Sequence, residues 1–386
     1  MIENDWREGK PQPKKVYYLP VSITFGKPEW RYRMYWYKKD YNEYTKKYQE
    51  FYYPHVFVNP FVTGWKCNRE KDFPQAKYIV SDSGGYQLGV HTKGTKTSCL
   101  DVLRWQENIA DIGFTLDTPS FSYESEVATY RYYTEDHFKR CMEVSNKNAI
   151  KMFGAQENEK MELWAVIQGG KYDDLKMWYD DLGKACDFKG YCVPVASTSV
   201  PRKNEYWLSQ LNFAKEVNTN FHFLGKCEPL LVATIAKLAQ KTGKYYTYDT
   251  TSAATGLMLG KYTDPFFLMG LNFTKKKETV NFDMDGPPPC DCPVCQKHTV
   301  KEMITEYALL FLHNVYARKR FNEYIVGMVQ DDEVFNNLLN KLLDIKTVYR
   351  KNKDMFKEGI NNLVYDEPIK QSTVSEYVGT EEFNWE

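Results

Sequence analysis

The sequence has no uninterrupted apolar run near the roughly 18 residues that a membrane span requires. Its first ten residues, MIENDWREGK, lack the basic-then-apolar pattern of a signal peptide. There is no low-complexity tract, and 42% hydrophobic with 26% charged residues is typical of a globular protein with a large core. We therefore expect a cytoplasmic protein with no membrane partner.

The chain also has no excess of charge of either sign, because 51 Lys and Arg residues balance 51 Asp and Glu residues. A polyanion would have to be bound by a local basic patch. Nine cysteines in 386 residues are too few for a secreted disulfide framework. Three of them crowd into six positions, which favours metal ligation, and we interpret the other six as small buried hydrophobic residues.

Eight short segments rich in β-branched and aromatic residues recur along the chain, separated by stretches long enough for a helix. Most are nearly continuous apolar runs, the pattern of parallel strands buried on both faces. Helical periodicity between them, as in 171–182 and 228–241, predicts an α/β fold, the (β/α)₈ TIM barrel. The stretch 31–53 is a possible insertion. The predicted strands are Val21–Phe25, His55–Val58, Tyr78–Ser81, Ile112–Leu116, Trp164–Ile167, Tyr191–Val195, Phe221–Leu224 and Tyr245–Tyr248.

Four short polar residues follow predicted strands: Asp82, Asp117, Gln168 and Asp249. In such barrels the catalytic groups lie at the carboxyl ends of the strands, so these side chains should converge at one mouth. Each aspartate alone is about as readily explained as a turn former or helix N-cap. Four together favour a site.

Two glycine-containing motifs fall at the same mouth. Residues 81–87, Ser-Asp-Ser-Gly-Gly-Tyr-Gln, place a carboxylate, a hydroxyl and two glycines directly after a strand, and glycine lets backbone amides approach a ligand closely. A lone Ser-Gly-Gly could be only a tight turn. The Gln168 amide, followed by Gly169 and Gly170, has a donor and an acceptor for a guanine-like edge.

A metal site is predicted at Cys290, Cys292 and Cys295. Three thiolates at this spacing can bind one tetrahedral Zn²⁺, with an imidazole as the fourth ligand, and a filled shell makes the metal structural. His298 is close in sequence, whereas His313 lies on a predicted apolar helix, 304–316. The spacing alone leaves His313 open to interpretation as a core histidine.

These motifs resemble those of the tRNA-guanine transglycosylase superfamily over about residues 78–316. The resemblance implies a barrel with an inserted zinc-binding subdomain, a ping-pong base exchange, and no organic cofactor. We expect residues 1–330 to form the barrel domain, including the zinc subdomain at about 271–325, and the helical pattern from Asp331 onward predicts a C-terminal helical extension at 331–386. Members of the superfamily often form homodimers. The implied zinc ligands are Cys290, Cys292, Cys295 and His313.

The resemblance also assigns roles at the mouth. Asp249 would be the nucleophile that forms a covalent glycosyl-enzyme, and Asp82 the general acid and base. The other matched residues would bind the base: Asp117 and Gln168 at its pyrimidine edge, Tyr86 and Leu224 on its faces, and Ser83, Gly84 and Gly169 beside them.

Departures from the tRNA enzymes bear on the polymer. Residues 249–254, Asp-Thr-Thr-Ser-Ala-Ala, replace an Asp followed by a Pro-Thr-Arg run, so a basic group is missing. The usual Gly-Gly after the sixth strand is Pro194-Val195. In these differences the sequence resembles the DNA-modifying branch of the superfamily, which inserts 7-deazaguanines such as 7-cyano-7-deazaguanine. We therefore expect DNA to be favoured over tRNA.

Three basic stretches could bind a nucleic-acid strand: 35–53 with its interleaved tyrosines, 275–277 and 318–320. A solvated surface explains the first about equally well. Two rival classes remain. A non-catalytic nucleic-acid-binding paralogue would not need both Asp82 and Asp249, and a zinc hydrolase would need an open metal position.

Overall fold

A computed structural model gives the fold. It describes residues 16–21, 41–42, 47–48, 52–91, 97–120, 123–124, 129–130, 135–195, 206–225, 228–250, 253, 256, 260–264, 270–272, 283–345 and 347–365. None of the helices in these ranges is both long and apolar enough to cross a membrane.

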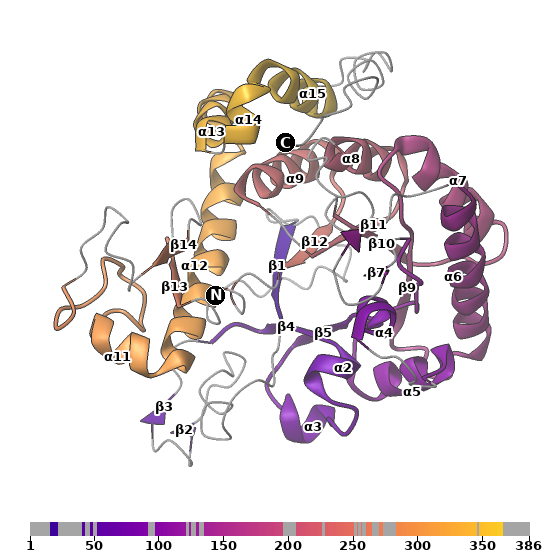
Figure 1. Ribbon diagram of the computed structural model, residues 1–386, viewed down its shortest axis with the longest axis horizontal. Coiled ribbons are helices and arrows are strands. Elements are labelled where there is room, and N and C mark those ends of the chain that lie inside the picture. The colour runs from indigo at the N-terminus through magenta and orange to yellow at the C-terminus, as the bar shows by residue number, and fades with distance from the viewer. Residues whose placement is uncertain are drawn as a thin grey trace.

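Within the described residues, eight parallel strands form one sheet in the order β1-β12-β11-β10-β9-β6-β5-β4. An isolated parallel bridge between Val21 and Phe57 joins the two end strands and brings the sheet close to full closure. Figure 1 shows the ring of helices around these strands. The predicted (β/α)₈ barrel is confirmed. Its strands are β1 (Val16–Pro20), β4 (His55–Val58), β5 (Tyr78–Ser81), β6 (Ile112–Phe114), β9 (Glu162–Val166), β10 (Gly190–Pro194), β11 (Asn220–Leu224) and β12 (Tyr246–Thr250).

The first strand was predicted wrongly. It is Val16–Pro20, which pairs along its whole length with β12, and not Val21–Phe25. Of the predicted segment, only Val21 is described, and residues 22–25 lie outside the described residues. The run at 16–20 contains a proline, which is tolerated at the last position because a strand end needs no further backbone donor.

Side chains alternate between the two faces of each barrel strand. On β11, Phe221 and Phe223 pack outward into the core beneath the helices, and on β12 so do Tyr246 and Tyr248. The opposite face of the sheet fills the barrel interior with a separate cluster: Leu19, Phe57, Val80, Ile112, Phe114, Trp164, Val166 and Cys192. The intervening residues of β11 and β12 therefore point into the interior.

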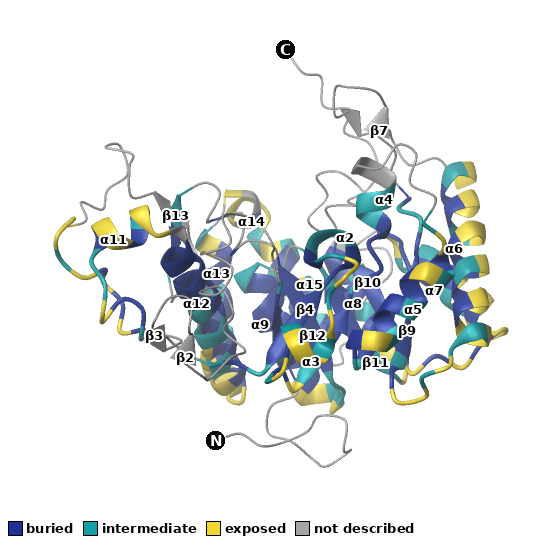
Figure 2. Cartoon of the chain, turned by 90° about the horizontal axis from the view of Figure 1, so that it is seen from below, coloured by how far each residue is buried: buried dark blue, intermediate teal, exposed yellow. Residues whose placement is uncertain are grey.

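The helices cover the outer face of the sheet. Figure 2 shows α6 with its exposed side turned away from the buried strands. The predicted helices at 171–182 and 228–241 are confirmed as α7 and α9. The helices that follow the barrel strands are α2 (Pro60–Thr63), α3 (Arg69–Asp72), α4 (Gly85–His91), α5 (Cys99–Ile109), α6 (Glu135–Ala155), α7 (Tyr172–Gly183), α8 (Tyr206–Glu216) and α9 (Pro229–Thr242).

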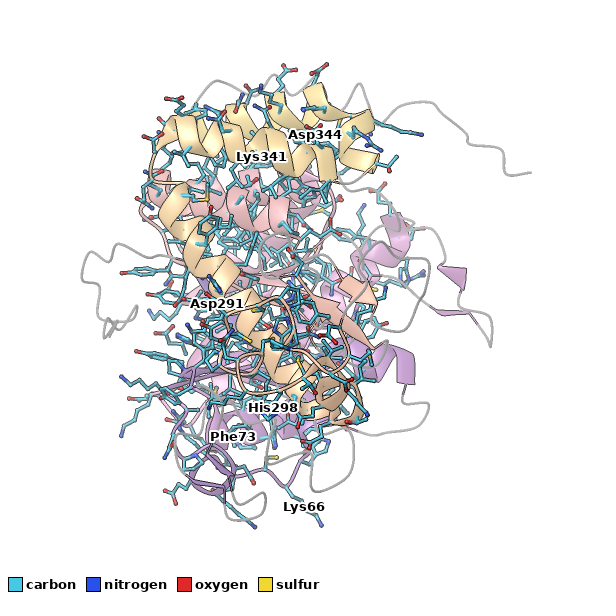
Figure 3. The ribbon with its side chains drawn as sticks, turned by 90° about the vertical axis from the view of Figure 1, so that its left-hand side faces the viewer. Lys66, Phe73, Asp291, His298, Lys341 and Asp344 are labelled. Carbon is cyan, nitrogen blue, oxygen red and sulfur yellow. The ribbon has the colours of Figure 1, made fainter. Side chains whose placement is uncertain are left out.

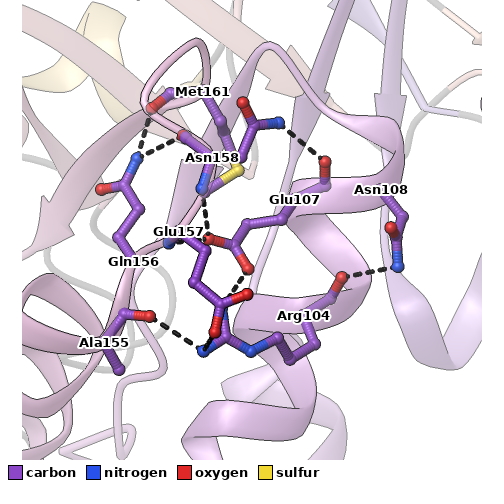
Figure 4. A network of polar contacts seen from close by, with 8 residues as sticks. All are labelled: Arg104, Glu107, Asn108, Ala155, Gln156, Glu157, Asn158 and Met161. Atoms are coloured by element: carbon purple, nitrogen blue, oxygen red, sulfur yellow. Dashed lines mark hydrogen bonds and ion pairs between the residues drawn. The ribbon is translucent and has the colours of Figure 1, made fainter.

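A polar network holds the barrel at the end opposite the mouth, where chain segments enter the strands. Glu107 on α5 accepts hydrogen bonds from the backbone amides of Glu157 and Asn158, at 2.5 and 2.9 Å. Arg104 donates to the carbonyl of Ala155 at 2.9 Å. These contacts, drawn in Figure 4, fix α5 to the turn before β9. Such contacts at the amino ends of barrel strands stabilise the fold.

The chain after β12 forms a second structural region beside the barrel. It contains the antiparallel pair β13 (Lys261–Thr263) and β14 (Gly270–Asn272), then α11 (Val300–Thr305) and α12 (Tyr307–Met328). The helix predicted at 304–316 is divided, because Glu306 leaves the helical conformation. Asn322 on α12 donates from Nδ2 to the carbonyl of Val16 on β1 at 3.1 Å, so α12 completes the helical ring.

Within the extension predicted at 331–386, residues 332–345, 347–351 and 353–365 are helical, and 366–386 lie outside the described residues. The helical residues form α13 (Asp332–Ile345), α14 (Thr347–Lys351) and α15 (Lys353–Tyr365), which pack against α8 and α9 on the outside of the barrel. Phe356 stacks on Trp207 of α8 with ring centroids 5.9 Å apart. Lys237, fully buried on α9, donates to the carbonyl of Val329 at 2.8 Å. The remaining short pairs are β2 (Tyr41–Asn42) with β3 (Lys47–Tyr48), and β7 (Tyr123–Glu124) with β8 (Thr129–Tyr130).

Candidate active site

The four polar residues predicted at the mouth all lie at or just beyond the carboxyl ends of barrel strands. Asp82 directly follows β5, and Asp249 is the next-to-last residue of β12. Asp117 and Gln168 follow β6 and β9 within three residues. Since all these strands run parallel in one barrel sheet, the polar groups share one end of the barrel.

The effects of the three carboxylates on neighbouring pKa values indicate that they lie close to one another. Burial raises the pKa of Asp82 from 3.8 to about 7, with further contributions from the charges of Asp117 and then Asp249. Burial also raises the pKa of the Cys192 thiol, which points into the barrel interior, and Asp82, Asp117 and Asp249 add to that increase. With a pKa of about 7, the carboxyl group of Asp82 carries a proton in a large fraction of the molecules near neutral pH.

Asp82 is oriented by its hydrogen bonds. Its Oδ2 accepts from Nδ2 of Asn59 at 2.6 Å, and its backbone amide donates to Val58 at 2.9 Å. The side chain is only half buried. A carboxyl group held in place, with a pKa near neutrality and partial access to solvent, is suited to proton transfer.

Asp117 and Gln168 form a second, buried polar unit. Ser83 donates to Oδ1 of Asp117 at 3.1 Å, and Nε2 of Gln168 donates to Oδ2. Oε1 of Gln168 accepts from the backbone amide of Ser120 at 2.8 Å. Burial raises the pKa of Asp117 to about 6, against the opposing effect of these donors. The unit presents hydrogen-bonding groups at fixed positions beside Asp82.

The two glycines after Ser83 are required by space. Gly84 has a φ of +80°, which side chains rarely adopt, and a Cβ there would lie 2.3 Å from the Phe61 ring. A Cβ at Gly85 would lie 2.3 Å from Oδ1 of Asp117 and 2.4 Å from its carbonyl oxygen. The Gly-Gly pair therefore lets the β5–α4 turn lie directly against Asp117.

Asp249 is buried and held by two donors on one oxygen. Its Oδ1 accepts from the backbone amide of Gly225 at 2.7 Å and lies 3.1 Å from Nε2 of His222. Sequence reasoning missed His222, because β11 was interpreted simply as an apolar run. Strand alternation could have found it: a histidine between Phe221 and Phe223, which face outward, must point into the barrel.

The other predicted base-binding residues surround this group. Tyr86 is half buried on α4, and Leu224 ends β11 and packs against the interior cluster. Gly169 is buried, and its carbonyl accepts from Nε2 of Gln210 at 2.9 Å. The structure thus brings all the predicted mouth residues to one end of the barrel.

A second cluster lies in the region after β12. The Sγ atoms of Cys290, Cys292 and Cys295 and one nitrogen of His313 all lie within 4.8 Å of one another. Nδ1 of His313 is 3.4 Å from Sγ of Cys292 and 3.3 Å from Sγ of Cys295. These separations fit the edges of a tetrahedron with metal–ligand bonds of about 2.0 to 2.3 Å. The cluster can therefore hold a metal ion such as zinc.

His313 is arranged as a ligand and not as a packing residue. Its Nε2 lies 2.9 Å from the carbonyl of Thr263, an acceptor, so Nε2 carries the proton and Nδ1 directs its lone pair at the thiols. The ring of Tyr262 stacks on the imidazole ring of His313, with ring centroids 4.0 Å apart. His298 lies outside the cluster, with Nδ1 3.5 Å from Glu302. Figure 3 labels His298 and Asp291 on the segment around the cluster.

Asn314 links this cluster to the chain that follows Asp249. Its Oδ1 accepts from the amide of Thr263 at 2.8 Å, and its Nδ2 donates to the carbonyls of Lys261 and Ala253, at 3.1 and 3.4 Å. His313 and Asn314 therefore hold β13 and the segment just after β12 from adjacent positions on α12.

Of the three predicted basic stretches, the one at 318–320 is described in full, and its Lys319 forms an ion pair with Glu323. Arg318 is buried, and Arg320 forms an exposed ion pair with Asp291, so the stretch presents less unpaired positive charge than its sequence suggests. Most of the stretch at 35–53, and all of 275–277, lie outside the described residues. Tyr53 is described and is buried, with its hydroxyl donating to the carbonyl of Tyr18 at 2.8 Å.

Comparisons with known proteins agree with this arrangement. Residues 71–344 match the family model described as queuine tRNA-ribosyltransferase. A tRNA-guanine(15) transglycosylase from Methanococcus aeolicus is 29% identical over 253 residues, covering 62% of this chain and 35% of the relative. The enzyme of that name from Methanocaldococcus jannaschii is 24% identical, covering 79% and 45%. A queuine tRNA-ribosyltransferase from Prochlorococcus marinus is 22% identical, covering 66% and 72%. The chain thus spans a third to a half of the length of these archaeal relatives.

Proposed function

The chain belongs to the queuine tRNA-ribosyltransferase family, and on that premise we propose that it exchanges a guanine base in a nucleic acid for a free 7-deazaguanine. The observation that carries the proposal is the convergence of Asp82, Asp117 and Asp249 at the barrel mouth, with the pKa of Asp82 raised to about 7. Two carboxyl groups with different surroundings can divide nucleophilic and proton-transfer duties.

In the first half-reaction, an oxygen of Asp249 forms a bond to the anomeric carbon as the bond from that carbon to N9 of guanine breaks. The electron pair of the broken bond passes to the leaving guanine, which takes the proton of Asp82. A carboxyl group with a pKa of about 7 is protonated in about half of the molecules at neutral pH. The product is a covalent aspartyl-glycosyl enzyme and free guanine.

In the second half-reaction, the incoming base loses its ring N–H proton to the Asp82 carboxylate and attacks the same carbon. The bond to Asp249 breaks and its electron pair returns to the carboxylate. Asp82 is again protonated and Asp249 again ionised, so the cycle closes without a redox cofactor. Because the target base must reach the mouth of the barrel, it has to leave the stack of the polymer first.

The unit formed by Asp117, Gln168 and Ser83 supports recognition of the base. Guanine presents two N–H donors along its pyrimidine edge, and a carboxylate accepts two donors. The fixed orientation of Asp117 suits it to this edge, while Gly84 and Gly169 allow close approach of the backbone. Tyr86 and Leu224 supply apolar surface for the faces of the ring.

We propose that the metal is a structural Zn²⁺ held by Cys290, Cys292, Cys295 and His313. Four protein ligands leave no open position, so the ion would contribute to folding and not to the reaction. We further propose that residues 1–330 form the reacting unit, including the zinc segment at about 271–325. In the extension from 331 onward, α13 and α15 would add stability by packing on α8 and α9.

The names of the relatives favour tRNA as the polymer over DNA. One feature favours DNA as a second candidate: Thr250, Thr251 and Ser252 stand where the tRNA enzymes have a Pro-Thr-Arg run. A missing cation weakens phosphate positioning, which orients a polymer without specifying its sequence.

Nucleoside mass spectrometry tests the proposal. The enzyme is incubated with 7-cyano-7-deazaguanine and either unmodified tRNA or duplex DNA, and each polymer is digested and analysed. We expect the modified nucleoside in tRNA, and its absence with Asp249→Asn. Incorporation into DNA alone would show that DNA, and not tRNA, is the substrate. Incorporation into neither polymer, together with no exchange of labelled guanine, would contradict the proposed activity.

A further inference from the structure

His222 is a fully buried histidine inside the barrel, directly beside Asp249. Its ring stacks on Phe57 with centroids 5.3 Å apart and planes 6° apart, and it lies 4.8 Å from the ring of Phe114. These apolar neighbours hold the imidazole in one orientation. A polar ring at this position therefore needs partners for both of its nitrogens.

Both ring nitrogens have such partners. Nδ1 lies 2.8 Å from Oγ1 of Thr247, and Nε2 lies 3.1 Å from Oδ1 of Asp249. An ionised carboxylate only accepts, so the proton resides on Nε2, and the Thr247 hydroxyl donates to Nδ1. Thr247 and Asp249 lie on the same face of β12, so each of them can contact one of the two ring nitrogens of His222.

The environment of His222 favours the neutral imidazole. Burial lowers the pKa of His222, and this outweighs the opposing effect of Asp249. A neutral donor orients the carboxylate without adding a full positive charge beside it. A cation at this place would stabilise the carboxylate and reduce its tendency to attack.

The contacts also distinguish the two carboxylate oxygens. Both His222 and the Gly225 amide are directed at Oδ1, and among the described residues no hydrogen bond reaches Oδ2. We propose, on the basis of the function proposed above, that His222 is a positioning residue. With Gly225 it fixes Oδ1 so that Oδ2 is the oxygen that bonds to the anomeric carbon. Holding a nucleophile in its attacking orientation contributes strongly to rate.

Two substitutions separate the effect of the hydrogen-bond donor from the effect of the ring shape. His222→Phe keeps a flat ring against Phe57 but removes the donor, and His222→Gln keeps an amide donor near the position of Nε2. His55→Phe is the matched control, because His55 is a buried, ring-stacked histidine at the start of β4, away from the mouth.

Single-turnover formation of the covalent adduct is measured with tRNA and with duplex DNA, together with calorimetric binding of 7-cyano-7-deazaguanine and thermal unfolding. We expect His222→Phe to slow adduct formation by about 100-fold, the scale for loss of one preorganised donor. The affinity for the free base should change less than about threefold. His222→Gln should form the adduct about tenfold faster than His222→Phe. His55→Phe should form it at the wild-type rate. An unchanged rate in His222→Phe, or a parallel loss of base affinity and folding without rescue by glutamine, would overturn the proposal.

A readout that needs no activity separates this inference from the proposed function. Nitrogen-15 NMR of labelled histidine should show His222 as the neutral ring with its proton on Nε2, and the signal should shift in Asp249→Asn. A proton on Nδ1, or a doubly protonated ring, excludes the positioning role even if the enzyme is active. Absence of any adduct in wild type, with the expected NMR state intact, would refute the proposed function instead.

Discussion

The side-chain amide of Asn59 donates a 2.6 Å hydrogen bond to Oδ2 of Asp82. The same nitrogen donates to Oε1 of Gln87 at 3.1 Å, and Oδ1 of Asn59 accepts from the backbone amide of Phe61 at 2.9 Å, capping α2. Asn59 therefore cannot turn without breaking a helix cap. The orientation of the proposed acid is set by the start of a neighbouring helix.

Asp82→Asn should stabilise the protein above neutral pH while abolishing exchange. Burial and the nearby carboxylates raise the pKa of Asp82 to about 7, so the folded state retains a proton that the unfolded state has lost. Wild type therefore loses stability as pH rises from about 4 through 7. We expect the variant to exceed wild type by roughly 1 to 3 kcal/mol in free energy of unfolding at pH 8. At pH 4 the variant and the wild type should have the same free energy of unfolding, as measured by urea unfolding.

Asp101→Asn is a control for which we expect the opposite change in the free energy of unfolding. The pKa of Asp101 is lowered by its hydrogen bonds from the Ser98 backbone and hydroxyl in a capping box. Its contribution to stability is present above its unfolded pKa and is lost as pH falls. This variant should be less stable than wild type at pH 8. A gain in both variants would show that the effect at Asp82 is not electrostatic.

Asp249→Asn should eliminate the covalent adduct. The amide cannot act as the nucleophile, and loss of a nucleophile lowers the rate by on the order of 1,000-fold or more. Denaturing gel electrophoresis of enzyme incubated with tRNA detects the adduct as a band of reduced mobility. Asp180→Asn, on the exposed face of α7, should form it normally. An adduct in Asp249→Asn would require a different nucleophile.

Cys292→Ser should release the metal and destabilise the region after β12. Cys292 is fully buried in the cluster, and a structural metal contributes its binding free energy to folding. We expect less than about 0.1 equivalent of bound metal and a clearly lower Tm. Cys67→Ser, at a thiol that donates to the Thr63 carbonyl and lies outside the cluster, should keep both values. Full metal content in Cys292→Ser would show that this thiol is not a ligand.

Gly85→Ala should weaken base binding, because its methyl group would displace Asp117. The added Cβ would lie 2.3 Å from Oδ1 of that carboxylate, where no side-chain rotation relieves the contact with the carbonyl oxygen at 2.4 Å. We expect KM for the free base to rise by roughly tenfold and stability to fall by about 1 to 3 kcal/mol. Gly154→Ala, in α6 with nothing within 4 Å of the new Cβ, should be neutral or slightly stabilising. Equal kinetics in the two variants would contradict the packing described at Asp117.

The strands of the barrel could be predicted well from hydrophobic runs, because parallel strands buried on both faces leave few polar interruptions. The first strand was misplaced because Val16–Pro20 contains two tyrosines and a proline, whereas the next run is richer in β-branched residues. What decided between them was pairing with β12, a contact between residues some 230 positions apart that no local pattern encodes. The break at Glu306 likewise depends on packing around α11.

The mouth residues could be predicted because short polar side chains stand out after apolar strands. His222 could not be found by that rule, since it lies within a strand and its role depends on which face it occupies. Arg318 and Arg320 show a limit of reading charge from sequence: basic residues two positions apart on a helix point in different directions, one into the core and one toward Asp291.

The hydrogen bond from Asn322 to Val16 joins residues 306 positions apart. During synthesis, β1 leaves the ribosome well before β12, the strand it pairs with, and α12, the helix that packs on it. The nascent chain must therefore carry an open sheet edge through most of translation, and such edges are templates for pairing with other chains. Closure of this barrel is a late event, and the long delay before it makes β1 the segment that most needs protection while the protein is being made.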